Sequence, residues 1–131
     1  MGGTPVVTNA GECQRDGWDE PSRGKVSWYT LLSGDVTPTN ALSCGIAEFE
    51  PRIGILKPHR HTPPEIYHIL EGQGVLTLEG EERVVKGGDT VFIPGDAEHG
   101  IRNESDAVLR FFYVFPTDRF SDVVYRFPDD A

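Results

Sequence analysis

The sequence predicts a single all-β domain built as a small barrel, and three observations support this prediction. The chain has 131 residues, a length that fits one domain with one hydrophobic core. From residue 65 onward it consists of short segments rich in β-branched and aromatic residues, separated by turns that contain glycine. No window shows the apolar period of a competing helix. A barrel with side chains alternating inward and outward is the natural product of such segments.

We expect three parts along the chain. Residues 1–24 are rich in Gly, Pro, Asp and Glu and carry no sustained period, which predicts an N-terminal arm lying over the barrel. Residues 25–127 are assigned to the barrel, and residues 128–131 to a loose C-terminal tail.

The barrel strands are expected where apolar alternation lies between turn residues. The first two are the segments KVSWYTLL and ALSCGIAEFEP. Six more follow: EIYHILEG, GVLTLEG, EERVVKGG, DTVFIPG, EHGIRNE and AVLRFFYVF. The segment between Phe120 and Phe127 is too apolar for a free tail, so we predict a last strand packed on the barrel or on a partner subunit.

The net charge limits the kinds of binding partner to expect, and the cysteine content indicates the cellular compartment. Twelve basic residues stand against 21 acidic ones, for a net charge of −9, which argues against nucleic acid or an anionic membrane as partner. The chain has no apolar run of secretory-signal or membrane-span length. Cys13 and Cys44 are too few and too far apart for a disulfide framework or a CxxC motif. We expect a cytoplasmic protein with reduced thiols.

Residues 58–72 concentrate metal-ligand side chains immediately before an apolar run. Side chains alternate faces in an extended segment, so His59 and His61 are expected to point the same way. The two prolines that follow turn the chain and return the carboxylate of Glu65 toward the imidazoles. Downstream of a Pro-Gly turn, His99 offers a fourth ligand. We predict one mononuclear metal site formed by these four side chains.

Three imidazoles and one carboxylate suit one divalent transition metal per chain, namely Fe, Mn, Ni, Co or Zn. Such an ion keeps open positions for water and substrate when it is five- or six-coordinate. The donor set does not choose among these metals.

Two motifs in these runs resemble those of the cupin superfamily. The first motif is HxH, three or four residues, Glu, six residues, Gly, and its positions are His59, His61, Glu65 and Gly72. The second is Gly, five residues, Pro, then His and three residues to Asn, and its positions are Gly88, Pro94, His99 and Asn103. The resemblance covers roughly residues 45–115. It implies a single-domain cupin, a double-stranded β-helix or jelly-roll barrel.

Tyr67 is the most informative residue beyond the predicted ligands. It follows Glu65 by two positions on one strand, so its phenol is expected to point into the same cavity. A nearby cation there would favour a phenolate that could act as a general base. An ordinary aromatic side chain filling a small barrel fits the position equally well.

The C-terminal segment FYVFPTDRFSDVVYRF, together with HRHTPPEIYHILEGQG, resembles small single-domain cupins that include dimethylsulfoniopropionate lyases. The resemblance implies a metal-dependent lyase acting on a small carboxylate or carbonyl substrate. In it, Tyr67 would remove the proton α to the carboxylate and Tyr125 would assist. An Fe(II)-dependent dioxygenase of the same fold and a non-catalytic cupin that binds a small ligand remain as alternatives.

Self-association is also expected. The apolar end with Phe120, Val124 and Phe127, together with the VSWYTLL strand, would supply a face or an edge for pairing. We therefore predict a homodimer.

Overall fold

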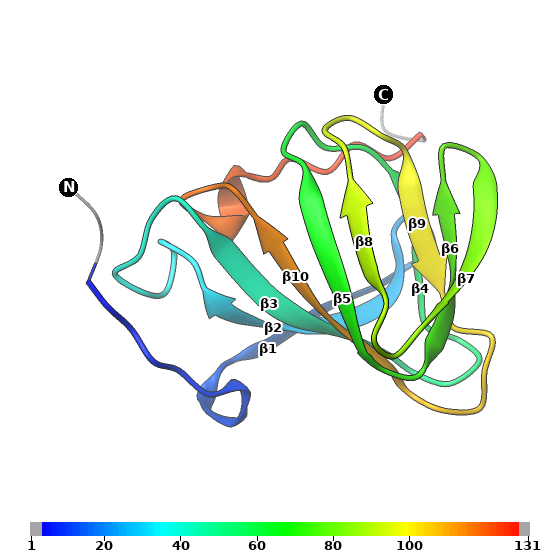
Figure 1. Cartoon of the computed structure of the whole chain (residues 1–131), viewed down its shortest axis with the longest axis horizontal. Coiled ribbons are helices and arrows are strands. Elements are labelled where there is room, and N and C mark those ends of the chain that lie inside the picture. Colours follow the sequence, from blue (N-terminus) through cyan, green and yellow to red (C-terminus); the bar gives the residue numbers. More distant parts are fainter. Residues whose placement is uncertain (1–3, 129–131) are drawn as a thin grey trace.

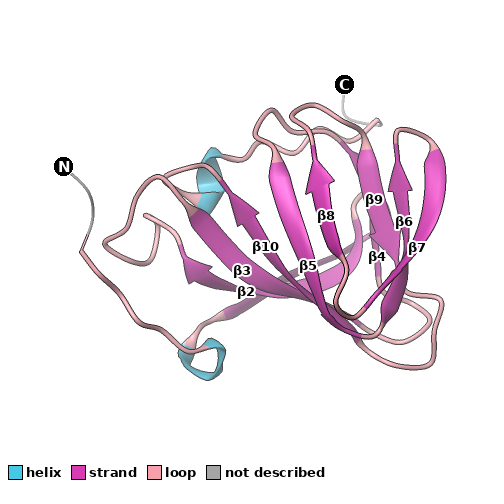
Figure 2. Ribbon diagram, in the orientation of Figure 1, coloured by secondary structure: helices cyan, strands magenta, loops and turns pink. Residues whose placement is uncertain are grey.

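The computed structural model describes residues 4–128, which form one curved antiparallel sheet of ten strands (Figure 1). The strands are β1 (Arg15–Glu20), β2 (Gly24–Leu32), β3 (Ser43–Phe49), β4 (Ile55–His59), β5 (Glu65–Glu71), β6 (Gln73–Leu78), β7 (Glu81–Lys86), β8 (Thr90–Ile93), β9 (His99–Arg102) and β10 (Leu109–Phe115). Within this part of the chain the helical content is two short 3-10 turns, η1 (Ala10–Glu12) and η2 (Phe120–Asp122) (Figure 2). The all-β prediction is confirmed.

The strand order curls the sheet toward a barrel. The order is β7-β6-β9-β4-β2-β3-β10-β5-β8. β1 lies off this path and pairs with β2. β5 and β7 lie near opposite ends of this order and yet contact each other. The sheet therefore has an inner surface on which side chains from distant strands meet.

Alternation along β5 and β10 builds that inner surface. On β5, Glu65, Tyr67 and Ile69 are buried while the residues between them are exposed. On β10 every second residue from Leu109 to Phe115 is buried. The period of two predicted from the sequence is therefore real, and the inner face of β5 carries both a carboxylate and a phenol.

Gly72 connects β5 to β6 in a conformation that only glycine adopts easily. Its φ is +82°, and a Cβ there would lie 2.2 Å from the carbonyl oxygen of Val108. Both observations exclude a larger residue. The glycine of the first motif thus fixes the turn that follows the strand carrying Glu65 and Tyr67.

Asn103, the last residue of the second motif, holds loops together rather than joining the site. Its side-chain nitrogen donates to the carbonyl oxygens of Phe49 at 3.1 Å and Ala107 at 2.8 Å. Its oxygen accepts from the backbone nitrogen of Ser105 at 3.0 Å. The side chain is buried, so these bonds meet its polar needs.

All eight strands expected from residue 25 to residue 115 are present, β4 is an additional strand that was not expected, and two other regions differ from expectation. Residues 15–20, inside the expected arm, form β1 and pair along their whole length with β2. The strand predicted between Phe120 and Phe127 was wrong. That segment begins as η2 and makes only one isolated bridge, between Arg60 and Arg126. The arm and barrel boundaries stay a prediction, and residues 129–131 of the expected tail lie outside the described residues.

The expected dimer surface is largely internal. β2 pairs with β1 on one side and with β3 and β4 on the other, so it offers no free edge. Phe127 is buried against the barrel, whereas Val124 remains exposed. The homodimer stays a prediction. Two parts of the surface on which it was predicted, the β2 strand and Phe127, are occupied within the chain itself.

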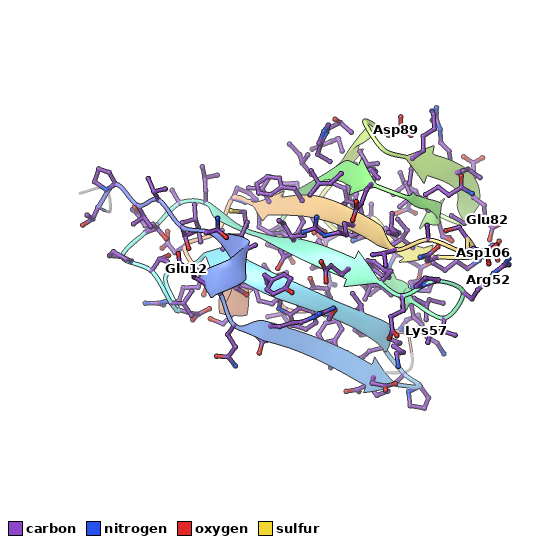
Figure 3. The ribbon with its side chains drawn as sticks, turned by 90° about the horizontal axis from the view of Figure 1, so that it is seen from below. Glu12, Arg52, Lys57, Glu82, Asp89 and Asp106 are labelled. Carbon is purple, nitrogen blue, oxygen red and sulfur yellow. The ribbon has the colours of Figure 1, made fainter. Side chains whose placement is uncertain are left out.

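Charged side chains lie at the periphery of the sheet. In Figure 3, Arg52 and Asp106 lie close together at one end, where the guanidinium Nε donates to the carboxylate at 2.6 Å. None of the helices in the described part of the chain is long and apolar enough to cross a membrane.

Candidate metal centre

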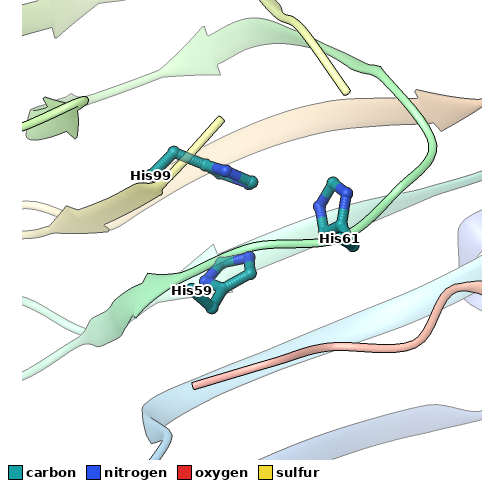
Figure 4. A group of neighbouring side chains, drawn as sticks. All are labelled: His59, His61 and His99. Carbon is teal, nitrogen blue, oxygen red and sulfur yellow. The ribbon is translucent and has the colours of Figure 1, made fainter. Parts of the chain in front are cut away.

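Three buried histidines converge from the strands β4 and β9 and from the loop that joins β4 to β5 (Figure 4). His59 ends β4 and is the ladder partner of His99, which begins β9. His61 follows His59 by two residues, and its ring points toward the other two (Figure 4). One ring nitrogen from each histidine lies within 4.8 Å of the others. The predicted clustering of these side chains is present.

Backbone carbonyls fix the orientation of all three rings. The Nδ1 of His59 lies 2.8 Å from the oxygen of Lys57, that of His61 2.8 Å from the oxygen of Pro63, and that of His99 2.9 Å from the oxygen of Ala97. A carbonyl oxygen only accepts, so each Nδ1 donates its proton to it. Each ring therefore directs its Nε2 toward the common centre, which is the arrangement of a metal ligand.

Glu65 brings a carboxylate to the same centre. It begins β5 after Pro63 and Pro64, as the sequence predicted, and its side chain is buried. Its Oε1 lies 3.1 Å from the Nε2 of His61 and 3.4 Å from that of His99. The structure thus places all four predicted ligands side by side.

The unsatisfied nitrogens test whether a metal fits. The Nε2 atoms of His59 and His99 are buried and make no hydrogen bond within the described residues. A buried polar atom without a partner costs about 1–3 kcal/mol, so an electron-pair acceptor at the centre would remove that cost. Three neutral imidazoles and one carboxylate are donors for a divalent transition metal. The residues therefore fit the ion that the sequence predicted, and they do not select its identity.

Burial sets the protonation of His59. Loss of water and the nearby His99 lower the pKa of His59 from 6.5 to about 2. Its imidazole is therefore neutral at physiological pH and available as a ligand.

We expect the metal-free protein to lose stability in acid because of this shift. The unfolded chain binds a proton at His59 below pH 6.5 and the folded chain does not. The free energy of unfolding should therefore fall by up to about 1.4 kcal/mol per pH unit as the pH drops from 6.5 toward 2. Urea denaturation of EDTA-treated protein at pH 7.5 and 5.5 measures this loss.

His59→Gln should reduce the pH dependence, because the amide does not titrate. His68→Gln is the matched control. His68 faces outward on β5 and bonds Thr90 through its Nδ1 at 2.8 Å, as its alternation predicted. If both variants kept the slope of the unmodified protein, His59 would not be the group responsible.

A small cavity lies beside the metal centre, and Glu65 belongs to both. The centre of a water molecule can occupy about 30 Å³ of this cavity. Three tyrosines line it, Tyr67, Tyr113 and Tyr125, and the remaining aromatic residues of its wall are Trp18, Trp28, Phe111 and Phe120. Space of this size holds a group of a few heavy atoms.

The position of Tyr67 fits both roles considered from the sequence, a phenol facing the cavity and an aromatic ring packed in the barrel. It lines the cavity next to Glu65, and its ring also stacks on Phe111 with centroids 4.1 Å apart. Burial, followed by the charge of Glu65, raises the pKa of Tyr67 well above 10 in the metal-free protein. The phenol is therefore protonated there, and a cation bound near Glu65 would oppose that shift.

Tyr125 reaches the metal centre from the far end of the chain. Its ring lies 4.9 Å from that of His59 and 5.3 Å from that of His61, measured between centroids. The segment carrying it is fixed by two backbone bonds between Arg60 and Arg126, and by an ion pair between Arg126 and Asp96. The predicted apolar end therefore packs back on the barrel, over the ligand strand.

Sequence reasoning missed Trp18, Trp28 and Tyr113 as cavity residues. Tyr113 lies opposite Tyr67 across the β5–β10 ladder, and the alternation of LRFFYVF could have identified it. Trp18 lies on β1, a segment without the alternating apolar pattern of a strand. Its partner across the β1–β2 ladder is Val26, another residue of the cavity wall, so only the pairing itself shows that this tryptophan faces the cavity.

A cupin domain model matches residues 45–115, which include all four candidate ligands. The chain belongs to the cupin family. It is 40% identical over 127 residues to the dimethylsulfoniopropionate lyase DddW of Ruegeria pomeroyi, an alignment that covers 97% of this chain and 82% of that protein. It is also 30% identical over 95 residues to an oxalate-binding protein of Thermotoga maritima, covering 70% of this chain and 76% of the relative.

Solved cupin structures share the fold. The polyketide cyclase RemF of Streptomyces resistomycificus superimposes with a TM-score of 0.79 at 22% identity, covering 98% of this chain and 88% of RemF. A cupin-2 domain protein of Rhodospirillum rubrum gives a TM-score of 0.76 at 20% identity, with coverages of 99% and 84%. At these identities the likeness establishes the cupin barrel alone.

Proposed function

We propose that this cupin is a metal-dependent lyase that eliminates a leaving group from the β carbon of a small carboxylate substrate. The observation that carries the proposal is that Glu65 belongs both to the candidate metal centre and to the adjoining cavity. This residue contacts two of the three histidines, His61 and His99, and also lines the cavity that holds Tyr67 and Tyr125. The 40% identity to a dimethylsulfoniopropionate lyase supports this reaction class.

A bound divalent ion would act as a Lewis acid toward the substrate carboxylate, acidifying its α-proton and lowering the pKa of a nearby phenol. His59, His61, Glu65 and His99 would hold this ion. Tyr67 then accepts the α-proton, and the C–H electron pair forms the Cα=Cβ bond. The bond from Cβ to the leaving group breaks, and the leaving group takes its electron pair. Tyr125, which lines the same cavity, assists.

The enclosure of the site suits this chemistry. The three histidines are fully buried, and the adjoining cavity has room for only a few heavy atoms. Exclusion of bulk water protects a basic phenolate from protonation and strengthens its electrostatic interactions. We also propose that the protein works in the cytoplasm as a homodimer on a diffusible substrate.

Purified protein should convert dimethylsulfoniopropionate to acrylate and dimethyl sulfide, with loss of activity after EDTA treatment and recovery when metal returns. Proton NMR measures both products. Elimination consumes no oxygen, so the rate should be the same under argon and in air. Turnover that requires oxygen would instead support the dioxygenase alternative, and binding without turnover would support the non-catalytic one.

A further inference from the structure

The metal centre is closed off from solvent in this structure. His59, His61 and His99 are each exposed by 1% or less, and the centre of a water molecule can occupy about 30 Å³ of the cavity beside them. A substrate reaches such a centre only if part of the wall moves. The part of the wall that moves most easily should therefore be the route of entry.

Phe120 separates this cavity from a groove on the surface. The groove has about 400 Å³ of space between the N-terminal arm and the turn after β2, and Phe120 lines both the groove and the cavity. On β1, Asp16 lines the groove and Trp18 lines the cavity. On β2, Thr30 lines the groove and Trp28 lines the cavity. The two spaces are therefore neighbours along the same strands, and displacement of the Phe120 ring would join them.

Two other hollows adjoin the cavity, but paired strands separate each of them from it. One hollow shares Trp18 and Val26 with the cavity, and these two residues are partners in the β1–β2 ladder. The other hollow shares Glu65 and lies on the outer side of the β5–β10 ladder. Entry through either would break backbone hydrogen bonds of the sheet. Phe120 lies in η2, outside the sheet, so its displacement leaves the ladders intact.

The segment that carries Phe120, residues 117–122, is held to the turn after β2 by side-chain hydrogen bonds. The backbone nitrogen of Phe120 donates to Ser33 Oγ at 2.9 Å. Asp35 accepts two bonds from Ser121, one from its backbone nitrogen at 3.1 Å and one from its hydroxyl at 2.7 Å. Both bonds to Asp35 are exposed to solvent, and bonds of this kind open locally more easily than a buried ladder does.

Both ends of this segment are fixed to the barrel. At one end the hydroxyl groups of Thr117 and Ser43 lie 2.8 Å apart. At the other end Val123 is buried. Hinges at these two ends would let Phe120 swing out of the cavity wall while the strands on either side stay paired.

We propose that residues 117–122 form a lid over the cavity beside the metal centre, with Phe120 as the side chain that closes the cavity. The hydrogen bonds to Ser33 and Asp35 act as a latch. When the latch opens, Phe120 leaves the wall and the groove becomes continuous with the cavity. Small ligands enter and leave the centre by this path. The lid concerns access to the centre, so it does not depend on the reaction that takes place there.

Chemical modification of the buried histidines in the metal-free protein measures how often the lid opens. Diethyl pyrocarbonate acylates neutral imidazoles that it can reach, and tandem mass spectrometry gives a rate for each histidine. His68 is exposed on β5 and serves as a reference within the same chain. In the unmodified protein, His59, His61 and His99 should react at least about tenfold more slowly than His68, because they react only while the lid is open.

Two variants test the lid from its two sides. Phe120→Ala removes the closing side chain, so the buried histidines should react at least about tenfold faster while His68 keeps its rate. Ser121→Ala removes one bond of the latch from an exposed residue and leaves the cavity wall intact, so they should react about threefold faster. Phe92→Ala removes an exposed ring outside the cavity wall and should change none of the rates.

Thermal melting shows whether each variant is folded at the assay temperature. If Phe120→Ala were unfolded there, the rates of Ser121→Ala would decide. Unchanged rates in the folded variants would overturn the lid and indicate entry through one of the two ladders. Faster reaction in Phe120→Ala but not in Ser121→Ala would also overturn it, because the ring would then be a plug held by packing alone.

The lid and the lyase can fail separately, because the modification assay uses neither metal nor substrate. The expected rates in a protein that performs no elimination would keep the lid and reject the proposed function. Elimination by a protein whose buried histidines react equally in all variants would keep the lyase and reject the lid.

Discussion

Tyr67→Phe should lower kcat for elimination by at least about 100-fold, because general acid–base groups typically contribute about 10² to 10⁴ in rate. The substitution removes one oxygen and keeps the ring that stacks on Phe111. Metal content and fold should therefore survive. KM should change little, since the lost contact acts in the transition state. Steady-state kinetics with product detection by NMR measures both constants.

Tyr29→Phe is the matched control for this substitution. Tyr29 lies on β2, outside the cavity wall, where Arg15 packs over its ring with the guanidinium carbon 5.5 Å from the centroid. Tyr29→Phe also removes one phenol oxygen, and it should leave kcat unchanged. Near-normal turnover by the Tyr67 variant with intact metal would mean that Tyr67 only packs the barrel, and a metal-centred mechanism would become the better interpretation.

His61→Ala should abolish both metal binding and turnover. It removes one converging Nε2 and leaves Glu65 without its nearest nitrogen partner, 3.1 Å away. Changes to residues that merely orient a ligand typically cost about 10- to 100-fold in metal affinity, so loss of a ligand should cost at least that. Elemental analysis after dialysis should find about one ion per unmodified chain and well under half an ion per variant chain.

His68→Ala controls for the loss of an imidazole as such. His68 is exposed on the outer face of β5 and contacts Thr90 rather than the metal centre. Its substitution should preserve metal content and turnover. Full metal occupancy in a double variant that lacks both His59 and His61 would contradict the assignment of the centre.

The sequence predicted the clustering of the four candidate ligands because these residues lie in regular local structure. Alternation along an extended segment places His59 and His61 on one side, and two prolines return Glu65 toward them. The fourth ligand came from a motif, and the structure explains it as a ladder pair, since His59 and His99 are directly opposite on β4 and β9. Local periodicity and family spacing were sufficient here.

Strand pairing between segments far apart in the chain could not be predicted from the sequence. Most residues of β1 are exposed, so burial alternates little along the strand. Its sequence therefore lacks the apolar period from which a strand could have been predicted. Its place is set by pairing with β2, which the local composition does not encode. The segment after β10 carries apolar residues without strict alternation. Its aromatic rings fill the open end of the barrel instead of forming a ladder.

Elimination by removal of an α-proton is tested most directly with substrate carrying two deuterons on the α carbon. The metal-loaded protein, under argon, should release acrylate that retains one of the two deuterons, together with one dimethyl sulfide per acrylate, and should do so more slowly than with ordinary substrate. Mass spectrometry of the acrylate gives the result. Equal rates of acrylate release from the deuterated and the ordinary substrate, or no product without oxygen, would contradict the account.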